Sequence, residues 1–469
     1  MFTDNPVVVI FLFLNLMFGF IALFKPKLGF YLLLVITPFT DFVKRLAFMF
    51  STPSRYEINI IVGAPDLIVL GIYVSLMSKI ILQKQLSFST KERFFLMLFI
   101  VWCLLKTFWS SVPIVANLAA AKLWLMYVPF FIFAPLLITS QSFMKKIIKI
   151  VVICAFISSL YGIFQAFNGM LPFEKKWSDA GISLLGLETY FMYGILRPFS
   201  TFSSGDAFSY YLIFALFFMP LILKPRKGFI IYIMIFIALI LSLVRTSIIL
   251  FLLLIFLYVI YSKYRSPIVK TASVISLVLI SAVILNYFEP LFYKLFESQN
   301  EYENLYVARL MTIGTYSDRV KGRRYLIENF DKKTLYGYGL GSAGIGNVAL
   351  NRFDIESGIS ELSYVHDSVS EFIVTVGLIG FLLFVLFFIF FYKNAIWGLE
   401  LYVKDKFWKE LLLRTIIFSV GILVVVNLSG GSFWGTRPVV ILFWSIMGIS
   451  SNVVEKFKYK NKNDNYLVE

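Results

Sequence analysis

His366 is the single histidine of this 469-residue chain, and it lies where a long polar segment meets an apolar run. Its imidazole is the side chain best suited to exchanging protons near neutral pH. The sequence Val365-His366-Asp367 therefore predicts a general base at this junction, with Asp367 orienting the imidazole or tuning its pKa. The alternative is an interfacial histidine that hydrogen-bonds to the backbone. Gly377 and Gly380, which follow in the apolar run, are predicted to form a helix-packing motif.

Four arginines could bind an anion beside this histidine. Residues 317–330 are predicted to form a short helix, which places Arg319 and Arg323 one turn apart on the same face. Arg197 and Arg245 adjoin apolar runs, where an arginine usually faces a polar cavity or an ionic partner. Guanidinium groups make paired, permanently charged contacts with phosphate oxygens, so this set suits a diphosphate. The alternatives are a solvated loop surface and arginines that snorkel to the membrane interface.

The elements that must position these residues are membrane-spanning helices. The chain is 59% hydrophobic, contains 52 Phe and 26 Tyr, and has a mean hydropathy of +0.83. Apolar runs of about twenty residues alternate with polar connections, which excludes a soluble globular fold. The sequence predicts an all-α polytopic membrane protein with about 12–14 spans, near residues 6–24, 28–41, 58–83, 93–109, 123–139, 147–167, 199–223, 229–245, 246–261, 268–288, 367–392, 411–428 and 433–452.

Charge in the connections predicts the orientation of these spans. The formal net charge of +16 comes from Lys and Arg scattered between spans, which argues against nucleic acid as a partner. By the positive-inside rule, the basic connections near Lys25, Lys79 and Lys146 are cytoplasmic. Residues 168–197 and 289–366 are then a smaller and a larger periplasmic loop of one membrane domain, residues 1–469. The larger loop is long enough to carry functional residues.

Two further features of the sequence are weaker signals. Tyr336-Gly-Tyr-Gly-Leu-Gly-Ser-Ala-Gly344 contains the spacing G-x-G-x-x-G, but no strand and helix of a dinucleotide fold flank it. We interpret it as a flexible turn. One histidine and two cysteines cannot build a familiar zinc site, so neither a metal nor a cofactor is predicted. Cys103 and Cys154 fall within expected spans and are predicted to pack as small apolar residues.

Three of these motifs together resemble the bacterial O-antigen ligase and O-antigen polymerase family, over roughly residues 195–392. The first is Arg245 after a span. The second is Ser317-x-Arg319 followed by the glycine-rich stretch at Tyr336. The third is His366-Asp367, then nine residues, then Gly377-Leu-Ile-Gly380 entering an apolar helix.

The resemblance implies a GT-C-like glycosyltransferase at the outer face of the bacterial inner membrane, acting by a metal-independent inverting mechanism. The donor would be an undecaprenyl-diphosphate-linked glycan. The acceptor glycan would be a lipid-linked repeat unit for a polymerase or lipid A core for a ligase, with membrane lipid and a chain-length regulator as further partners. His366 would be the general base, and Arg197, Arg245, Arg319 and Arg323 would hold the diphosphate.

Two departures from the ligase pattern favour a polymerase. Asp367 stands where family ligases usually have Asn, Ser or Gln, and Phe381-Leu382 replaces a polar pair that often follows the second glycine. The alternatives are an O-antigen ligase, a lipid-linked oligosaccharide flippase or other transporter, and an interaction scaffold. A transporter is expected to carry charges through both halves of the membrane, whereas the predicted site residues here cluster on the outer side.

Overall fold

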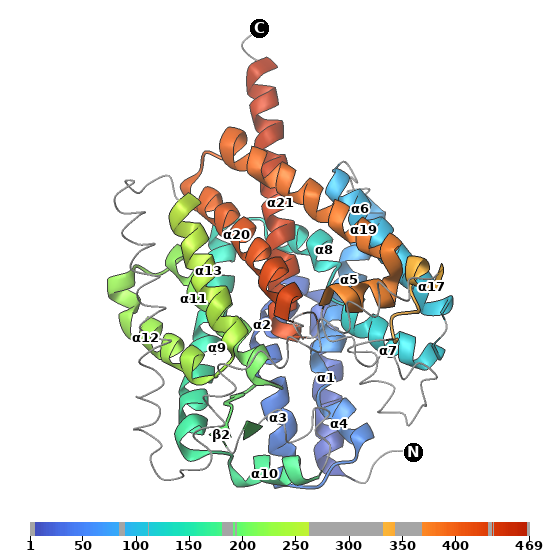
Figure 1. The fold of residues 1–469 in the computed structure, drawn as a ribbon, viewed down its shortest axis with the longest axis vertical. Helices are drawn as coiled ribbons and strands as arrows, with labels where there is room; N and C mark the ends of the chain where they lie inside the picture. The colour runs from blue at the N-terminus through green and yellow to red at the C-terminus, as the bar shows by residue number, and fades with distance from the viewer. Residues whose placement is uncertain are drawn as a thin grey trace.

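In the part of the chain that the computed structural model describes, the protein is a bundle of α-helices with one short β-hairpin (Figure 1). That part comprises residues 5–83, 90–110, 112–180, 191–192, 195–261, 332–342, 368–429, 434 and 436–466. The hairpin joins β1 (Phe191–Met192) to β2 (Ile195–Leu196) in antiparallel register. The structure thus confirms the predicted all-α polytopic class.

The first group of helices is divided by proline and by side-chain caps. Asn5 caps the first helix by accepting a hydrogen bond from the backbone N–H of Val7, and Pro38 lies in a 3-10 turn that ends the second. The helices are α1 (Pro6–Phe24), α2 (Pro26–Ile36), α3 (Thr40–Leu46), α4 (Arg55–Ile61), α5 (Ala64–Gln83), α6 (Lys91–Phe108), α7 (Ile114–Leu125), α8 (Phe130–Leu137), α9 (Gln141–Asn168) and α10 (Pro172–Asp179).

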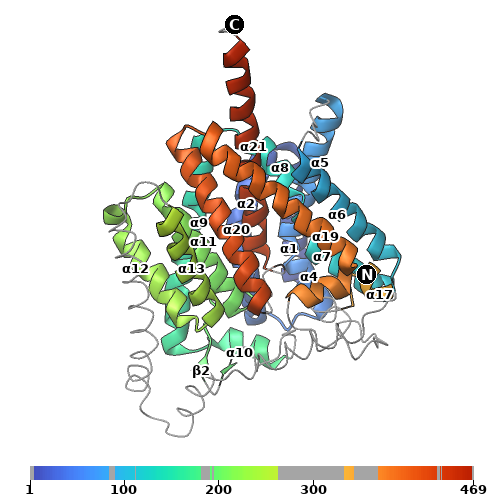
Figure 2. The ribbon, with the colours of Figure 1, turned by 45° about the horizontal axis from the view of Figure 1, so that its top comes forward.

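The second group of helices packs against the first. These helices are α11 (Gly205–Phe218), α12 (Pro225–Leu241), α13 (Arg245–Tyr261), α17 (Lys332–Tyr336), α19 (Ser368–Trp397), α20 (Lys406–Ser429) and α21 (Arg437–Tyr466). In Figures 1 and 2, α12 and α13 lie on one side of the bundle and α17 lies on the other. The predicted functional segments therefore fall on two sides of a common core.

The helix α21 runs through the centre of the bundle (Figure 1). Within Arg437–Tyr459, 89% of the residues in the most apolar stretch of α21 are buried. In the most apolar stretch of α1, only 17% are buried. Gly448 allows close packing, because a Cβ there would approach the carbonyl carbon of Phe131 on α8 to 2.6 Å. Small residues that let helix backbones approach are the usual basis of helix association in a membrane. The core is therefore built on α21, and α1 faces lipid.

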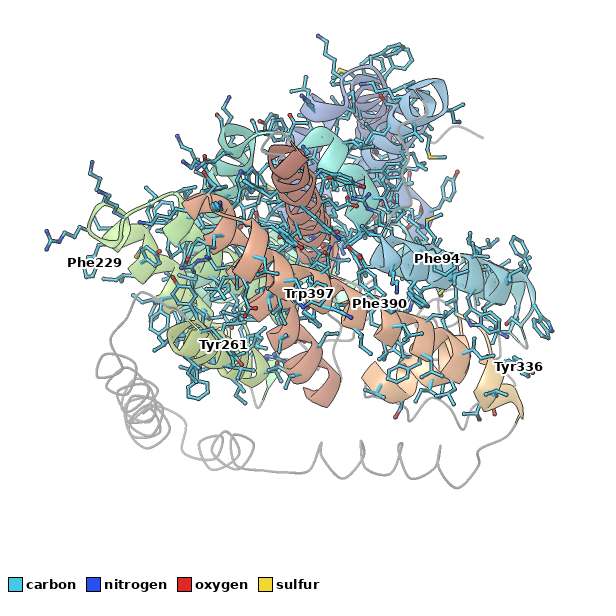
Figure 3. The ribbon with its side chains drawn as sticks, turned by 90° about the horizontal axis from the view of Figure 1, so that it is seen from above. Phe94, Phe229, Tyr261, Tyr336, Phe390 and Trp397 are labelled. Atoms are coloured by element: carbon cyan, nitrogen blue, oxygen red, sulfur yellow. The ribbon has the colours of Figure 1, made fainter. Side chains whose placement is uncertain are left out.

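Aromatic and aliphatic side chains cover the perimeter. Phe229 and Tyr336 lie at opposite margins of the bundle when it is viewed along its length (Figure 3), and they are 62% and 40% exposed. A surface of this kind is expected where the surrounding medium is lipid.

Long apolar helices account for several of the predicted spans. Five helices of the described residues are long and apolar enough to cross a membrane, or six if α7 and α8, which meet at a bend of 41°, form one broken span. This count covers only helices of 18 or more residues in the described part of the chain, so the 12–14 spans predicted for the whole chain stay a prediction. Apolar runs at 199–223, 229–245 and 246–261 form α11, α12 and α13, which have only 14, 17 and 17 residues. The expected span at 268–288 lies outside the described residues.

Candidate active site

The turn that carries Arg197 packs directly against the turn that carries Arg245. Gly205 begins α11, and a Cβ at this position would lie 3.4 Å from the Pro198 carbonyl oxygen and 3.7 Å from the Ser242 carbonyl oxygen. One turn further along, the buried hydroxyls of Ser209 and Ser247 form a hydrogen bond of 2.5 Å between α11 and α13. The structure therefore brings together two segments that lie about 45 residues apart in the sequence.

Both turns contain a strained residue. Ser200 has a φ of 51° and Leu243 a φ of 56°, and these are the only non-glycine residues with positive φ among those described. Side chains other than glycine rarely adopt this conformation, and such strain is typical of functional sites that the surrounding structure holds in place. Ser200 lies three residues after Arg197, and Leu243 lies two residues before Arg245. Among the described non-glycine residues, positive φ therefore occurs only in the two turns that adjoin Arg197 and Arg245.

The guanidinium of Arg197 retains binding capacity. It contacts Asp206 at 3.3 Å through one terminal nitrogen, and the carboxylate side chain of Asp206 is 39% exposed. Its Nε is buried and has no hydrogen-bond partner within the described part of the chain. A buried donor without a partner is costly, so an acceptor is expected to approach it. Arg245 is the first residue of α13, directly after the turn.

A buried ion pair stabilises the turn that carries Arg197. Arg45 of α3 donates to a Glu174 carboxylate oxygen of α10 at 2.9 Å, and the two side chains are 1% and 0% exposed. Arg45 also donates to the Ser200 carbonyl oxygen at 2.5 Å and lies over the Phe199 ring at 4.5 Å. Gln165 of α9 completes the network, because it donates to both Glu174 oxygens and accepts from the Ser200 N–H. The strained turn is therefore held by three helices.

The second predicted region is a break in α19. Gly377 has φ 75° and ψ 173°, a conformation that is accessible almost only to glycine, and it interrupts the helix nine residues after its start at Ser368. A Cβ on Gly377 would lie 2.5 Å from the Leu335 carbonyl oxygen, so α17 packs directly against the break. The indole N–H of Trp102 on α6 donates to the freed carbonyl of Val376 at 2.7 Å. Gly380 also packs on Trp102, with a Cβ there only 2.8 Å from the ring.

The glycine-rich stretch after α17 fills this break. The backbone N–H groups of Tyr338 and Gly339 donate to the carbonyl oxygens of Val374 and Thr375, at 2.8 and 3.1 Å. The Gly341 N–H donates to the side-chain oxygen of Asn117 on α7 at 2.9 Å. We expected a flexible turn here, and residues 337–342 form a turn that packs tightly against its neighbours. Its glycines are required because three elements approach the backbone closely, and sequence spacing does not reveal such an approach.

Four predicted site residues cannot be placed. Arg319, Arg323, His366 and Asp367 lie outside the described residues. Of the residues that can be placed, Arg197 precedes α11 and Arg245 begins α13, in two segments that pack against each other. Gly377 and Gly380 lie on the other side of the bundle, among α6, α7 and α17 (Figure 2).

Sequence reasoning missed a charged cluster to which four helices contribute. Lys122 of α7 forms an ion pair with Asp66 of α5, and Arg437 at the start of α21 interacts electrostatically with Asp66 and with Asp41 of α3. Burial tends to raise the pKa of the Asp41 carboxyl, but Lys44, Arg437 and Arg45 together lower it. One signal was available, because Arg437-Pro438 repeats the Arg197-Pro198 pattern at the edge of an apolar run.

The expected packing of the cysteines is confirmed, since Cys103 and Cys154 are both free and buried. The part of the chain that the structure describes contains no group of three or more His, Cys, Asp or Glu side chains able to hold a metal ion.

The helical bundle defines a multi-pass membrane protein in which the segments that carry Arg197 and Arg245 pack together. Residues 229–385, about a third of the chain, match the family model described as O-antigen ligase. The family includes O-antigen polymerases as well as ligases, and its members are membrane glycosyltransferases that act on lipid-linked glycans. No curated protein matches the chain. The matched region contains every predicted site residue except Arg197.

Proposed function

We propose that this glycosyltransferase polymerises the repeat units of a surface polysaccharide at the outer face of the bacterial inner membrane. The observation that carries the proposal is the junction of the Arg197 and Arg245 turns, where a buried N–H of the Arg197 guanidinium has no acceptor among the described residues. A diphosphate supplies such acceptors, together with the negative charge that an arginine site favours. The donor proposed for this site is an undecaprenyl-diphosphate-linked oligosaccharide.

The proposed reaction is a single inverting displacement. His366 removes the proton from an acceptor sugar hydroxyl as its oxygen bonds to the anomeric carbon of the donor. The bond between that carbon and the diphosphate breaks, and its electron pair leaves with undecaprenyl diphosphate. Arg197 and Arg245, together with Arg319 and Arg323, stabilise the charge that grows on the diphosphate. Asp367 orients the imidazole.

The acceptor distinguishes the polymerase from the second candidate, an O-antigen ligase. A polymerase uses another lipid-linked repeat unit, whereas a ligase transfers the finished glycan to lipid A core. Asp367 and the apolar pair Phe381-Leu382 depart from the ligase pattern and favour the polymerase. A flippase is a more distant alternative, because it also needs cations that escort a diphosphate.

The test is a reconstitution of the full chain in liposomes with undecaprenyl-diphosphate repeat units as the sole substrate. Separation by size should give a ladder of longer lipid-linked glycans, and His366→Ala should lower the rate of its formation about 10²- to 10⁴-fold. If no ladder forms until lipid A core is added, the protein is a ligase. Movement of the donor across the bilayer without a new glycosidic bond would identify a flippase.

A matched pair of arginine variants tests the anion site. Arg197→Ala should lower kcat about 10²- to 10³-fold, as expected for the loss of a donor to a developing anion. Arg226→Ala removes the same charge from an exposed position at the start of α12 and should change kcat less than about twofold. Equal rates for the two variants would exclude Arg197 from the site.

A further inference from the structure

A cavity of about 490 Å³ lies between the first turn of α2, the last turns of α5 and the end of α8. Its polar rim consists of Lys25, Lys27 and Lys79. Its apolar wall consists of Leu76, Ile80, Leu136 and Leu137, with Pro26 between the two. The cavity lies far along the chain from the arginine turns, and the proposed glycosyl transfer uses none of its residues.

The rim is strongly cationic. All three lysines are exposed, and no ion pair joins any of them to a carboxylate in the described part of the chain. Lys27 lies over the Phe143 ring at 5.9 Å, which holds its ammonium group near the cavity. The first backbone N–H groups of α2 add partial positive charge, because Lys25 at the N-cap provides no side-chain hydrogen bond. Three like charges around one concavity repel each other unless an anion lies among them.

The wall of the cavity has the opposite character. Leu76 and Ile80 lie one turn apart on α5 and are buried, as is Leu137 on α8, while Leu136 is 36% exposed. These side chains continue from the lysine rim toward the interior of the bundle along α5. A small inorganic anion would satisfy the lysines and leave this apolar wall unused. A molecule with an anionic head and a hydrocarbon chain would satisfy both parts.

We infer that this cavity binds an anionic phospholipid, whose phosphate lies among the three lysines and whose acyl chain packs against the leucines of α5 and α8. Basic pockets between membrane helices recognise such headgroups through charge, and each lysine close to the membrane surface contributes about a fivefold gain in affinity. The three lysines belong to the connections that the positive-inside rule places in the cytoplasm, so the lipid comes from the inner leaflet. The end of α5 and the projecting end of α21 lie at the same end of the molecule (Figure 2).

The test measures thermal unfolding of the purified full chain in a neutral detergent as phosphatidylglycerol is added. We expect phosphatidylglycerol to raise Tm in a saturable manner, phosphatidylcholine to have a much smaller effect, and inorganic phosphate at the same concentration to have none. The variant Lys25→Gln/Lys27→Gln/Lys79→Gln should require about a hundredfold more phosphatidylglycerol for half of the maximal Tm shift. If inorganic phosphate raised Tm equally, the cavity would bind a free anion and not a lipid. If phosphatidylcholine raised Tm equally, the cavity would have no preference for an anionic headgroup.

A matched variant controls for net charge. Lys146→Gln/Lys149→Gln/Lys227→Gln removes three exposed charges from the N-terminal parts of α9 and α12 and should keep the wild-type response. A second variant tests the wall without altering charge: Leu136→Trp should fill part of the cavity and weaken the response to phosphatidylglycerol. If the triple variant in the cavity does not fold, Lys79→Gln alone should weaken the response about fivefold. A wild-type response in the cavity variants would overturn the inference.

Discussion

Replacement of Glu174 by Gln should destabilise the protein by about 4 kcal/mol, although it removes no heavy-atom volume. Glu174 is 0% exposed and neutralises the guanidinium of Arg45, which is 1% exposed. Removal of one partner of a buried ion pair costs about 3–5 kcal/mol because it leaves the other charge without compensation. Gln165 adds to the loss, because its amide N–H group donates to both carboxylate oxygens of Glu174. In the variant, the new amide NH₂ at position 174 replaces one of these oxygens, so two hydrogen-bond donors face each other.

The assay is equilibrium unfolding in mixed micelles, with Glu57→Gln as the matched control. Glu57 forms the capping box at the exposed start of α4, where a glutamine keeps the cap, so this variant should lose less than about 0.5 kcal/mol. Glu174→Gln should also lower the rate of glycan extension, because Arg45 holds the Ser200 carbonyl in the turn that carries Arg197. Equal unfolding free energies for Glu174→Gln and Glu57→Gln would refute the reasoning that Arg45 depends on this carboxylate.

Three further variants probe the turns and the helix break. Gly377→Ala should lower the free energy of unfolding by about 3 kcal/mol or more, because φ 75° is strained for alanine and a Cβ would meet the α17 backbone. A loss below about 1 kcal/mol would contradict this close packing. Ser209→Ala and Ser247→Ala should each cost about 1–3 kcal/mol, and their double-mutant cycle should show coupling of about 1 kcal/mol; additive losses would disprove the bond between the turns. Trp102→Phe should cost about 1–3 kcal/mol by leaving the Val376 carbonyl without its donor, and a neutral effect in thermal unfolding would mean that another donor replaces it.

The class of fold could be predicted from the sequence because hydropathy measures transfer to lipid directly. The positions at which each helix begins and ends could not. A hydropathy window does not register these positions, and Pro38 divides a run that looks continuous. The bend between α7 and α8 has the same effect. Such breaks depend on which partner accepts the freed backbone groups, and that partner lies elsewhere in the chain.

The candidate site was predictable in its residue types and only partly in its arrangement. Arg197 and Arg245 stand out because arginine is costly beside apolar residues, and the structure joins their turns. The ion pair beneath them joins residues 129 positions apart, and no local pattern links Arg45 to Glu174. The same limit applies to the glycine-rich stretch, because Gly341 and its hydrogen-bond partner Asn117 are 224 positions apart in the sequence.

The central position of α21 has a consequence for the order of assembly. The helices that pack on it are synthesised first, and spans enter the bilayer as they leave the ribosome. Until Arg437–Tyr466 is made, the inner faces of α8, α11, α19 and α20 have no common partner, although all four contact α21 in the finished bundle. We therefore expect the earlier helices to be loosely packed until α21 is inserted. Insertion of α21 would then fix one set of neighbours.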